Sequence, residues 1–401
     1  MTKSITVTSI FLIALLIPTK CTDMQKSIHN LAIKLYSSLG ESNNNVLFSP
    51  LSAHIALILC YQGASGTTRN VLQDVLKLPI DSVDISEEYK KLLNDFNESK
   101  DDLTIAMANN IYIKKHYELQ SKFQTIANEY FAAHVENIDF SQSRSAANQI
   151  NKWVSEQTRN KIKDIISENA LNEETRLILV NAIYFKGLWM HPFKIHQTQD
   201  KFYVSKLQTV DCEMMRTTGE FFYVEDPVLD AKILKIPYMH SDIFFVIILP
   251  NSFHGFKNIE SKITTTGFST LEKDAILENI EVFLPKFKVE TSMDLKQPLQ
   301  DIGLGNIFSE KANFSQMLNS QQPLTISKVL QKTFIDINEN GTEAASATSV
   351  LMRVRRSLDL HHQTFRADRP FLFYVIDSAS STLLFMGKLM NPNPTKIRDE
   401  L

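Results

Sequence analysis

Two uninterrupted runs of aliphatic and aromatic residues limit the folds open to this chain: LILVNAIYF at 177–185 and IFFVIIL at 243–249. Runs of this length and composition are typical of strands that are buried on both faces, so other layers must cover the sheets. Further β-prone segments follow at 233–238, 281–290 and 371–376. The sequence therefore predicts large, covered sheets in the C-terminal part of the chain.

The N-terminal part has the periodicity of helices. Apolar residues repeat at three and four positions from Ile28 to Tyr36 and again from Ile55 to Cys60, and a similar pattern covers 150–162. The chain has 401 residues, and no Pro-, Gly- or Ser-rich linker divides it. We therefore expect one α+β domain rather than several domains.

Charge and motif content narrow the functional classes. The formal net charge is −3, and no concentrated basic face occurs outside the arginines at 353–356, so we expect protein partners and no nucleic acid. The sequence has no HExxH, GxSxG or Walker motif, and Gly303 and Gly305 lack the rest of a dinucleotide fingerprint. His361 and His362 are interpreted as a solvated pair. The sequence favours a protein that is not an enzyme and holds no metal or cofactor.

The first 22 residues have the layout of a secretory signal peptide. Lys3 precedes an apolar run at 10–17, and the polar stretch PTKCTD follows. Eight apolar residues are too few to cross a bilayer. We therefore predict that residues 1–22 are removed and that 23–401 form the mature chain, with no membrane span.

The mature chain would keep two cysteines, Cys60 and Cys212, whose spacing indicates neither zinc binding nor redox chemistry and does not determine whether they pair. Three Asn-x-Ser/Thr sequons begin at Asn97, Asn313 and Asn340. Asn97 and Asn313 are the glycosylation candidates.

The chain ends in Arg398, Asp399, Glu400 and Leu401. This tetrapeptide resembles the KDEL and HDEL tags that a retrieval receptor recognises at a free C-terminus. Arginine in the first position differs from both common forms. We expect retention in the endoplasmic reticulum and early Golgi, or secretion if the tag is weak.

Six motifs spread over the chain occur in the same order as in one known family. They are NVLFSPLS at 45–52, LVNAIYFKGLW at 179–189, LPKF at 284–287, NENGTEAASAT at 338–348, ADRPFL at 367–372 and LFMG at 384–387. Together they resemble the serpins. The resemblance implies a monomeric, single-domain α+β fold with three β-sheets, eight or nine helices and an exposed reactive-centre loop at about 339–362, which a serine protease attacks.

The start of this loop has the pattern of a strand with two different faces. One face contains only small or β-branched residues: Thr342, Ala344, Ser346, Thr348 and Val350. Glu343, the only charge, falls on the other face with Ala345, Ala347 and Ser349, which we expect to face solvent. Gly341 precedes the strand and can adopt a positive φ. Glu339 completes the hinge that the resemblance assigns, which extends to Thr348.

The resemblance also implies a mechanism and a gate. After cleavage the loop would insert into the central sheet as a new strand and carry the acylated protease with it, a movement of ~45 Å at ~3.3 Å per residue. Positions that match the family's gate are Ser49, Ser52, Asn181 and Gln331 in the shutter below the opening strands, and Trp189, Lys286 and Glu339 in the breach above them. Gln331 replaces a common histidine, which puts pH-sensitive gating in doubt.

Specificity is predicted from Arg353, Val354, Arg355 and Arg356. Furin-type convertases recognise Arg-x-Arg/Lys-Arg and cut after the last arginine, because an acidic cleft supplies a carboxylate for each guanidinium. The predicted bond is therefore Arg356–Ser357. The usual serpin spacing from Thr342 instead gives Arg355–Arg356, which suits a trypsin-like protease.

Other interpretations of the loop stay open. The chain could be a non-inhibitory chaperone or carrier, although the small hinge residues argue against this, or RVRR could be only a processing site. A glycan on Asn340 would be expected to obstruct insertion at the hinge, so the sequence predicts that Asn340 is unmodified.

Overall fold

The computed structural model describes residues 22–39, 43–79, 85–97, 102–253, 255–266, 274–320, 322–342 and 363–393. Residues 1–21 of the predicted signal peptide, the loop from 343 to 362 with all four RVRR positions, and the predicted retrieval tag lie outside the described residues.

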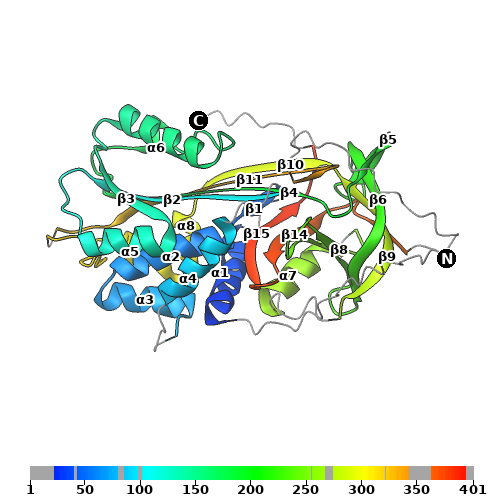
Figure 1. Ribbon diagram of the computed structural model, residues 1–401, viewed down its shortest axis with the longest axis horizontal. Coiled ribbons are helices and arrows are strands. Elements are labelled where there is room, and N and C mark those ends of the chain that lie inside the picture. The colour runs from blue at the N-terminus through cyan, green and yellow to red at the C-terminus, as the bar shows by residue number, and fades with distance from the viewer. Residues whose placement is uncertain are drawn as a thin grey trace, which may run out of the picture.

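A six-stranded sheet runs through the centre of the molecule (Figure 1). Its strands, in spatial order, are β10 (Phe287–Asp294), β11 (Ile326–Asn338), β12 (Gly341–Thr342), β4 (Leu177–Leu188), β2 (Leu103–Lys114) and β3 (Ala133–Ile138). β12 has only two residues, so β11 also pairs directly with β4 along most of its length. The long apolar run at 177–185 forms most of β4, as its composition predicts.

The other strands form a second, nine-stranded network. It contains β1 (Val46–Phe48), β15 (Thr382–Leu389), β14 (Phe371–Asp377), β8 (Ile243–Pro250), β7 (Ala231–Pro237), β6 (Thr209–Asp226), β9 (Ile276–Pro285), β13 (Gln363–Arg366) and β5 (Lys194–Tyr203). The 18-residue strand β6 pairs with β7 at one end and with β5 towards the other, so the network is two sheets joined through one long strand. With the central sheet this confirms the predicted three sheets.

Eight α-helices lie in the described part of the chain, which confirms the predicted number and the α+β class. They are α1 (Asp23–Leu39), α2 (Pro50–Gly63), α3 (Gly66–Leu76), α4 (Ile85–Asn97), α5 (Ser121–Phe131), α6 (Ser143–Gln157), α7 (Phe256–Thr266) and α8 (Lys296–Leu299). Short helical turns follow at Glu168–Ala170, Gln300–Leu304 and Gly305–Phe308. None of the described helices combines the length and apolarity that crossing a bilayer requires.

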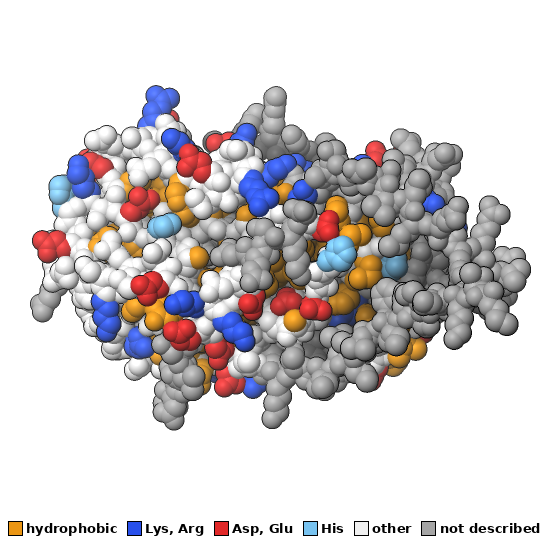
Figure 2. Space-filling view, viewed as in Figure 1, with side chains coloured by type: hydrophobic (Ala, Val, Ile, Leu, Met, Phe, Trp, Pro, Cys, Tyr) orange, Lys and Arg blue, Asp and Glu red, His pale blue; other side chains and the backbone are white. Residues whose placement is uncertain are grey.

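The central sheet separates two apolar cores. The larger core contains one face of this sheet, the second strand network and the helices α1 to α5. The smaller core lies on the opposite face, where α6 covers Ala182, Leu330 and Phe334 (Figure 1). Both faces of the central sheet are therefore buried where α6 lies across it. On the side that Figure 2 shows, acidic and basic side chains are interspersed over the described surface.

Three segments differ from the sequence-based expectation. The predicted strand at 281–290 is two strands in different sheets, because Lys286 separates β9 from β10. The predicted helix at 150–162 ends at Gln157, since the Thr158 hydroxyl bonds to the Val154 carbonyl and the next two residues adopt positive φ. The mostly helical N-terminal part also contains β2, whose polar Asn109 and Asn110 interrupt its apolar pattern.

Candidate functional site

The start of the predicted hinge lies between the C-terminal ends of β11 and β4 and is already part of the central sheet. β11 and β4 diverge there, and β12 fills the fork with antiparallel pairs on both sides. Thr342 lies opposite Ile337 of β11 and Gly187 of β4, and Gly341 lies opposite Asn338 and Leu188. Thr342, the first residue of the predicted inserting strand, and Gly341 before it are therefore already within the sheet.

Close backbone contact explains the glycine at position 341. A Cβ atom on Gly341 would lie 1.9 Å from the carbonyl oxygen of Gly187, so no larger residue fits between the strands. Its φ is +157°. A Cβ on Gly187 would lie 2.6 Å from the ring of Tyr238. Gly341 of β12 thus packs against the backbone of β4, and Gly187 of β4 packs against the ring of Tyr238.

An aromatic pair lies beneath the fork. Tyr238 stacks on Trp189 with ring centroids 4.5 Å apart, and its hydroxyl lies 2.6 Å from the hydroxyl of Thr342, which is fully buried. The Trp189 indole donates to the Asn338 carbonyl at 2.9 Å. Burial raises the pKa of Tyr238 well above its usual range, so the hydroxyl keeps its proton. Tyr238 thus holds the side chain of the first inserted strand residue.

The predicted breach pair is in contact. Lys286 Nζ lies 3.2 Å from Glu339 Oε1 and 3.5 Å from Glu213 Oε2. Burial alone would lower the pKa of Lys286, but the hydrogen bond and charge of Glu339, with Glu213, outweigh burial and raise it. The Lys286 side chain is 39% exposed, so solvent weakens this interaction.

The shutter below the fork is an amide network around Gln331. Its Nε2 donates to the carbonyl of Ser49 at 3.0 Å and to Asn181 Oδ1 at 2.9 Å, and its Oε1 accepts from the Ser49 N–H at 3.0 Å. Asn181 Nδ2 donates to the Ser52 carbonyl and to Asn109 Oδ1. All five residues are buried. One side chain of β11 is thus bonded both to β4 and to the start of α2.

The two shutter serines act through different atoms. The Ser49 hydroxyl caps α2 by accepting from the Ser52 N–H at 3.2 Å, and Pro50 follows at the first helical position. The Ser52 hydroxyl is buried and has no hydrogen-bond partner in the described part of the chain. Ser52 therefore contributes its backbone carbonyl to the network rather than its side chain.

Three residues of this region were missed by the motif comparison. Tyr238 holds the hinge, Asn109 extends the amide network, and Thr333 Oγ1 donates to the Leu47 carbonyl at 2.9 Å. The role of Asn109 could have been predicted from the sequence, because an amide inside an otherwise apolar strand needs buried hydrogen-bond partners. The role of Tyr238 could not have been predicted in this way, since it depends on Thr342, 104 positions away in the sequence.

The remaining predicted sites are dispersed. Asn97 is the last residue of α4, and Asn313 and Asn340 are exposed. Cys60 and Cys212 are both buried and free. Burial raises the pKa of both thiols, that of Cys212 to about 11 with a further contribution from the Asp200 charge.

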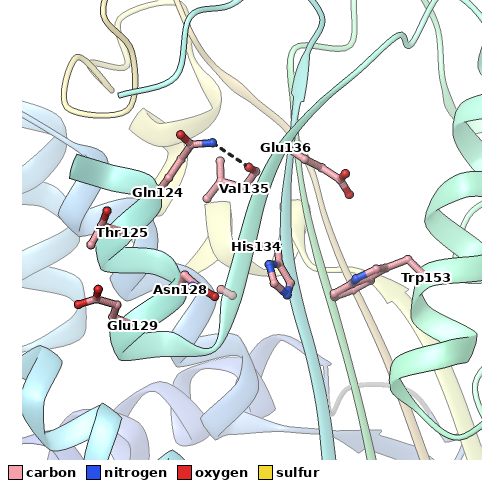
Figure 3. A pocket seen from close by; sticks show the side chains of 9 residues that line it. Gln124, Thr125, Asn128, Glu129, His134, Val135, Glu136 and Trp153 are labelled. Carbon is pink, nitrogen blue, oxygen red and sulfur yellow. Dashed lines mark hydrogen bonds between the residues drawn. The ribbon is translucent and has the colours of Figure 1, made fainter. Parts of the chain in front are cut away.

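A polar cavity of about 520 Å³ lies apart from the hinge, between α5, β3 and α6 (Figure 3). Trp153 of α6 faces His134 of β3 edge-on, and the Gln124 amide donates to the Val135 carbonyl. None of the predicted site residues lines this cavity. Within the described ranges, no three His, Cys, Asp or Glu residues are grouped so as to hold a metal ion.

Comparison with known proteins covers nearly the whole chain. The family model described as Serpin (serine protease inhibitor) matches residues 26–392. Neuroserpin of Gallus gallus is 34% identical over 379 residues, which are 92% of this chain and 91% of the relative. Leukocyte elastase inhibitor of Bos taurus is 34% identical, with 90% of this chain and 97% of the relative covered.

Solved structures agree with these matches. Serpin48 of the insect Tenebrio molitor has a TM-score of 0.83 at 32% identity, covering 92% of this chain and 98% of that chain. A complex of thyroxine-binding globulin with thyroxine has a TM-score of 0.83 at 26% identity, covering 93% and 100%. The chain therefore belongs to the serpin family, whose members are generally serine protease inhibitors rather than catalysts.

Proposed function

We propose that this protein is a suicide-substrate inhibitor of a furin-type proprotein convertase, attacked at Arg356–Ser357. The single observation that carries the target is the complete Arg-Val-Arg-Arg motif in the region that a serpin presents to proteases. The strand that would trap the protease begins at β12 and is continuous in sequence with this motif. Family membership supports inhibition in general, and the motif supports the choice of protease.

The register of β12 defines how the loop would insert. If the pairing of Thr342 with Ile337 and Gly187 continues, Thr348 falls between Gln331 and Asn181, and Arg353 falls opposite Ile326 at the start of β11. Each inserted residue would replace a direct β11–β4 contact by antiparallel pairs on two sides. Insertion therefore offers more backbone hydrogen bonds than the native sheet has.

The same register explains the composition of both faces of the loop. The Thr342 side chain points into the larger core, so Ala344, Ser346 and Thr348 would follow it inward. The opposite face was expected to meet solvent, but α6 and the smaller core cover this side of the sheet at Ala182 and Leu330. Small residues are therefore needed on both faces.

Glu343 is the exception because of its place beside the fork. It would lie between Asp336 of β11 and Lys186 of β4, both only partly buried. A charge is tolerated there because solvent and Lys186 can stabilise it, whereas an unpaired carboxylate deeper in the sheet would be costly.

The proposed site of action is the early secretory pathway. Residues 1–22 have the pattern of a signal peptide, and the C-terminal Arg-Asp-Glu-Leu resembles a retrieval tag. Convertases act on proteins that pass through this pathway, so the predicted signal peptide and retrieval tag support the same target as the arginine motif.

The test is incubation of the mature protein with a furin-type convertase, followed by a denaturing gel and mass spectrometry. We expect a complex that survives denaturation and a released C-terminal fragment that begins at Ser357. Cleavage without a complex would make the protein a substrate or a non-inhibitory family member. No cleavage by the convertase would favour a trypsin-like protease and the Arg355–Arg356 bond.

Three variants sharpen this test. Arg353→Ala should abolish attack by the convertase, which needs this arginine, but leave attack by a trypsin-like protease after Arg355 nearly unchanged. Thr348→Arg should leave cleavage intact and abolish the complex, because a charge would enter the shutter. Glu343→Arg is its matched control, since position 343 lies beside Asp336 near the fork, and it should retain the complex.

A further inference from the structure

Asn340 lies in a two-residue turn outside the central sheet. The turn consists of Glu339 and Asn340 and joins β11 to β12. The side chain of Asn340 is exposed and makes no hydrogen bond to any residue that the structure describes. Its backbone is fixed, because its N–H donates to Asn338 Oδ1 at 3.1 Å and its carbonyl accepts from the Trp189 N–H at 2.9 Å.

The neighbouring residues of the sequon have different environments. Gly341 has no room for a side chain, and Thr342 is fully buried with its hydroxyl against Tyr238. An enzyme that modifies an Asn-x-Thr sequon must reach the threonine hydroxyl as well as the asparagine. The folded hinge exposes only the asparagine, so any modification has to precede the closing of β12.

Insertion of the loop does not draw this turn into the sheet. The new strand would grow from Thr342 away from the turn, towards Gln331 and then Ile326. The Glu339 carbonyl accepts from the Phe193 N–H at 2.8 Å, so the turn is also held on its other residue. A group attached to Asn340 therefore has the same position before and after insertion.

We propose that Asn340 carries an N-linked glycan that is added before the hinge folds and is compatible with loop insertion. From the sequence we expected a glycan at the hinge to obstruct insertion. A glycan would do so only on a residue that enters the sheet, and Asn340 stays in the turn outside it. The proposal rests on passage through the secretory pathway, which belongs to the proposed function, but it does not depend on the identity of the target protease.

The test uses the full chain expressed in a secretory host, with peptide mass spectrometry of the secreted or retained protein. We expect a glycosylated peptide containing Asn340, and loss of one glycan from the intact mass of Asn340→Gln. Thr342→Ser keeps the sequon and should keep the glycan. An unmodified Asn340 overturns the proposal, whether or not Asn97 and Asn313 carry glycans.

A second measurement tests compatibility with insertion separately. The glycosylated protein and Asn340→Gln are each incubated with a convertase or, if none reacts, with trypsin, and the fraction of cleaved molecules that form a denaturant-stable complex is compared. Equal fractions are expected. A complex formed by Asn340→Gln but not by the glycosylated protein would show that the glycan blocks insertion. If neither protein forms a complex, the heat stability of the two cleaved proteins is compared instead. Equal heat stability would show that the glycan allows insertion, and a heat-stable cleaved form of Asn340→Gln alone would show that the glycan blocks it.

Discussion

The fork and the shutter both lie between β11 and β4, but they hold these strands in different ways. At the fork the strands are already apart and β12 lies between them, beside the Trp189–Tyr238 stack and a partly exposed ion pair. At the shutter the strands pair directly, and Gln331 joins them through a buried amide network. At the fork, β11 and β4 thus pair with β12 instead of with each other, whereas at the shutter they still pair directly. We infer that the barrier to further insertion lies mainly at the shutter.

Gln331→Ala should have the largest effect. It would leave the Ser49 N–H and carbonyl and Asn181 Oδ1 without their present partner, and each unsatisfied buried group costs about 1–3 kcal/mol. We expect the free energy of unfolding to fall by about 3 kcal/mol and spontaneous loop insertion to accelerate. Urea unfolding and the rate of conversion to a heat-stable form at fixed temperature would measure both.

Ser52→Ala is the control for this variant. The Ser52 hydroxyl is buried in the same region but has no partner in the described structure, so its removal should change stability by less than about 1 kcal/mol. Equal destabilisation by both variants would mean that burial in this region, not the Gln331 network, limits insertion.

Gln331→His should make the shutter sensitive to pH. A neutral imidazole at this buried position would have its pKa lowered by burial below the unfolded value of about 6.5. A group of this kind loses stability as pH falls below its unfolded pKa, because only the unfolded state then takes up the proton. Insertion rates measured from pH 8 to pH 5 should rise for the variant and stay flat for the parent protein. A flat profile for both would contradict the assignment of Gln331 to the gate.

Tyr238→Phe should have a moderate effect, confined to the fork. It removes the hydroxyl that meets Thr342 but keeps the ring on Trp189, at a cost of about 1 kcal/mol. We expect faster amide exchange at Gly341 and Thr342 and little change at Gln331. In a double-mutant cycle with Thr342→Val, the two effects should be non-additive, since both variants remove the same bond. Additive effects would mean that the hydroxyls act independently.

Glu339→Lys should have the smallest effect on stability. Its partner Lys286 is 39% exposed, and ion pairs open to solvent contribute about 0–1 kcal/mol, less at high salt. Charge reversal should nevertheless speed polymer formation on warming, because two like charges would then lie at the fork. Polymerisation kinetics at low and high salt check this, and unchanged kinetics at low salt would remove Glu339 from the gate.

The sequence predicted those parts of the molecule that depend on local pattern or on a long motif. The apolar runs gave the positions of β4 and β8, and the ordered motifs gave the fold and the contacts of Gln331, Asn181, Lys286 and Glu339. The break at Lys286 was missed because LPKFKVE keeps strand composition across a change of sheet. Tyr238 was missed because its partner Thr342 is distant in sequence, and the second covered face was missed because periodicity within one strand does not show what lies above it.

The tight contact of Gly341 with Gly187 gives the inserting strand a fixed starting point. Because the strand is anchored at Gly341, the position of each later residue in the sheet depends on its distance in sequence from Gly341. Residues added or lost between the hinge and the scissile bond therefore change only which arginine lies opposite the start of β11. The places of Arg355 and Arg356 relative to the end of the sheet are then set by the number of residues between them and Gly341. A serpin built in this way can acquire a new protease target by changing its loop length or its arginines, while the fork at which insertion starts stays the same.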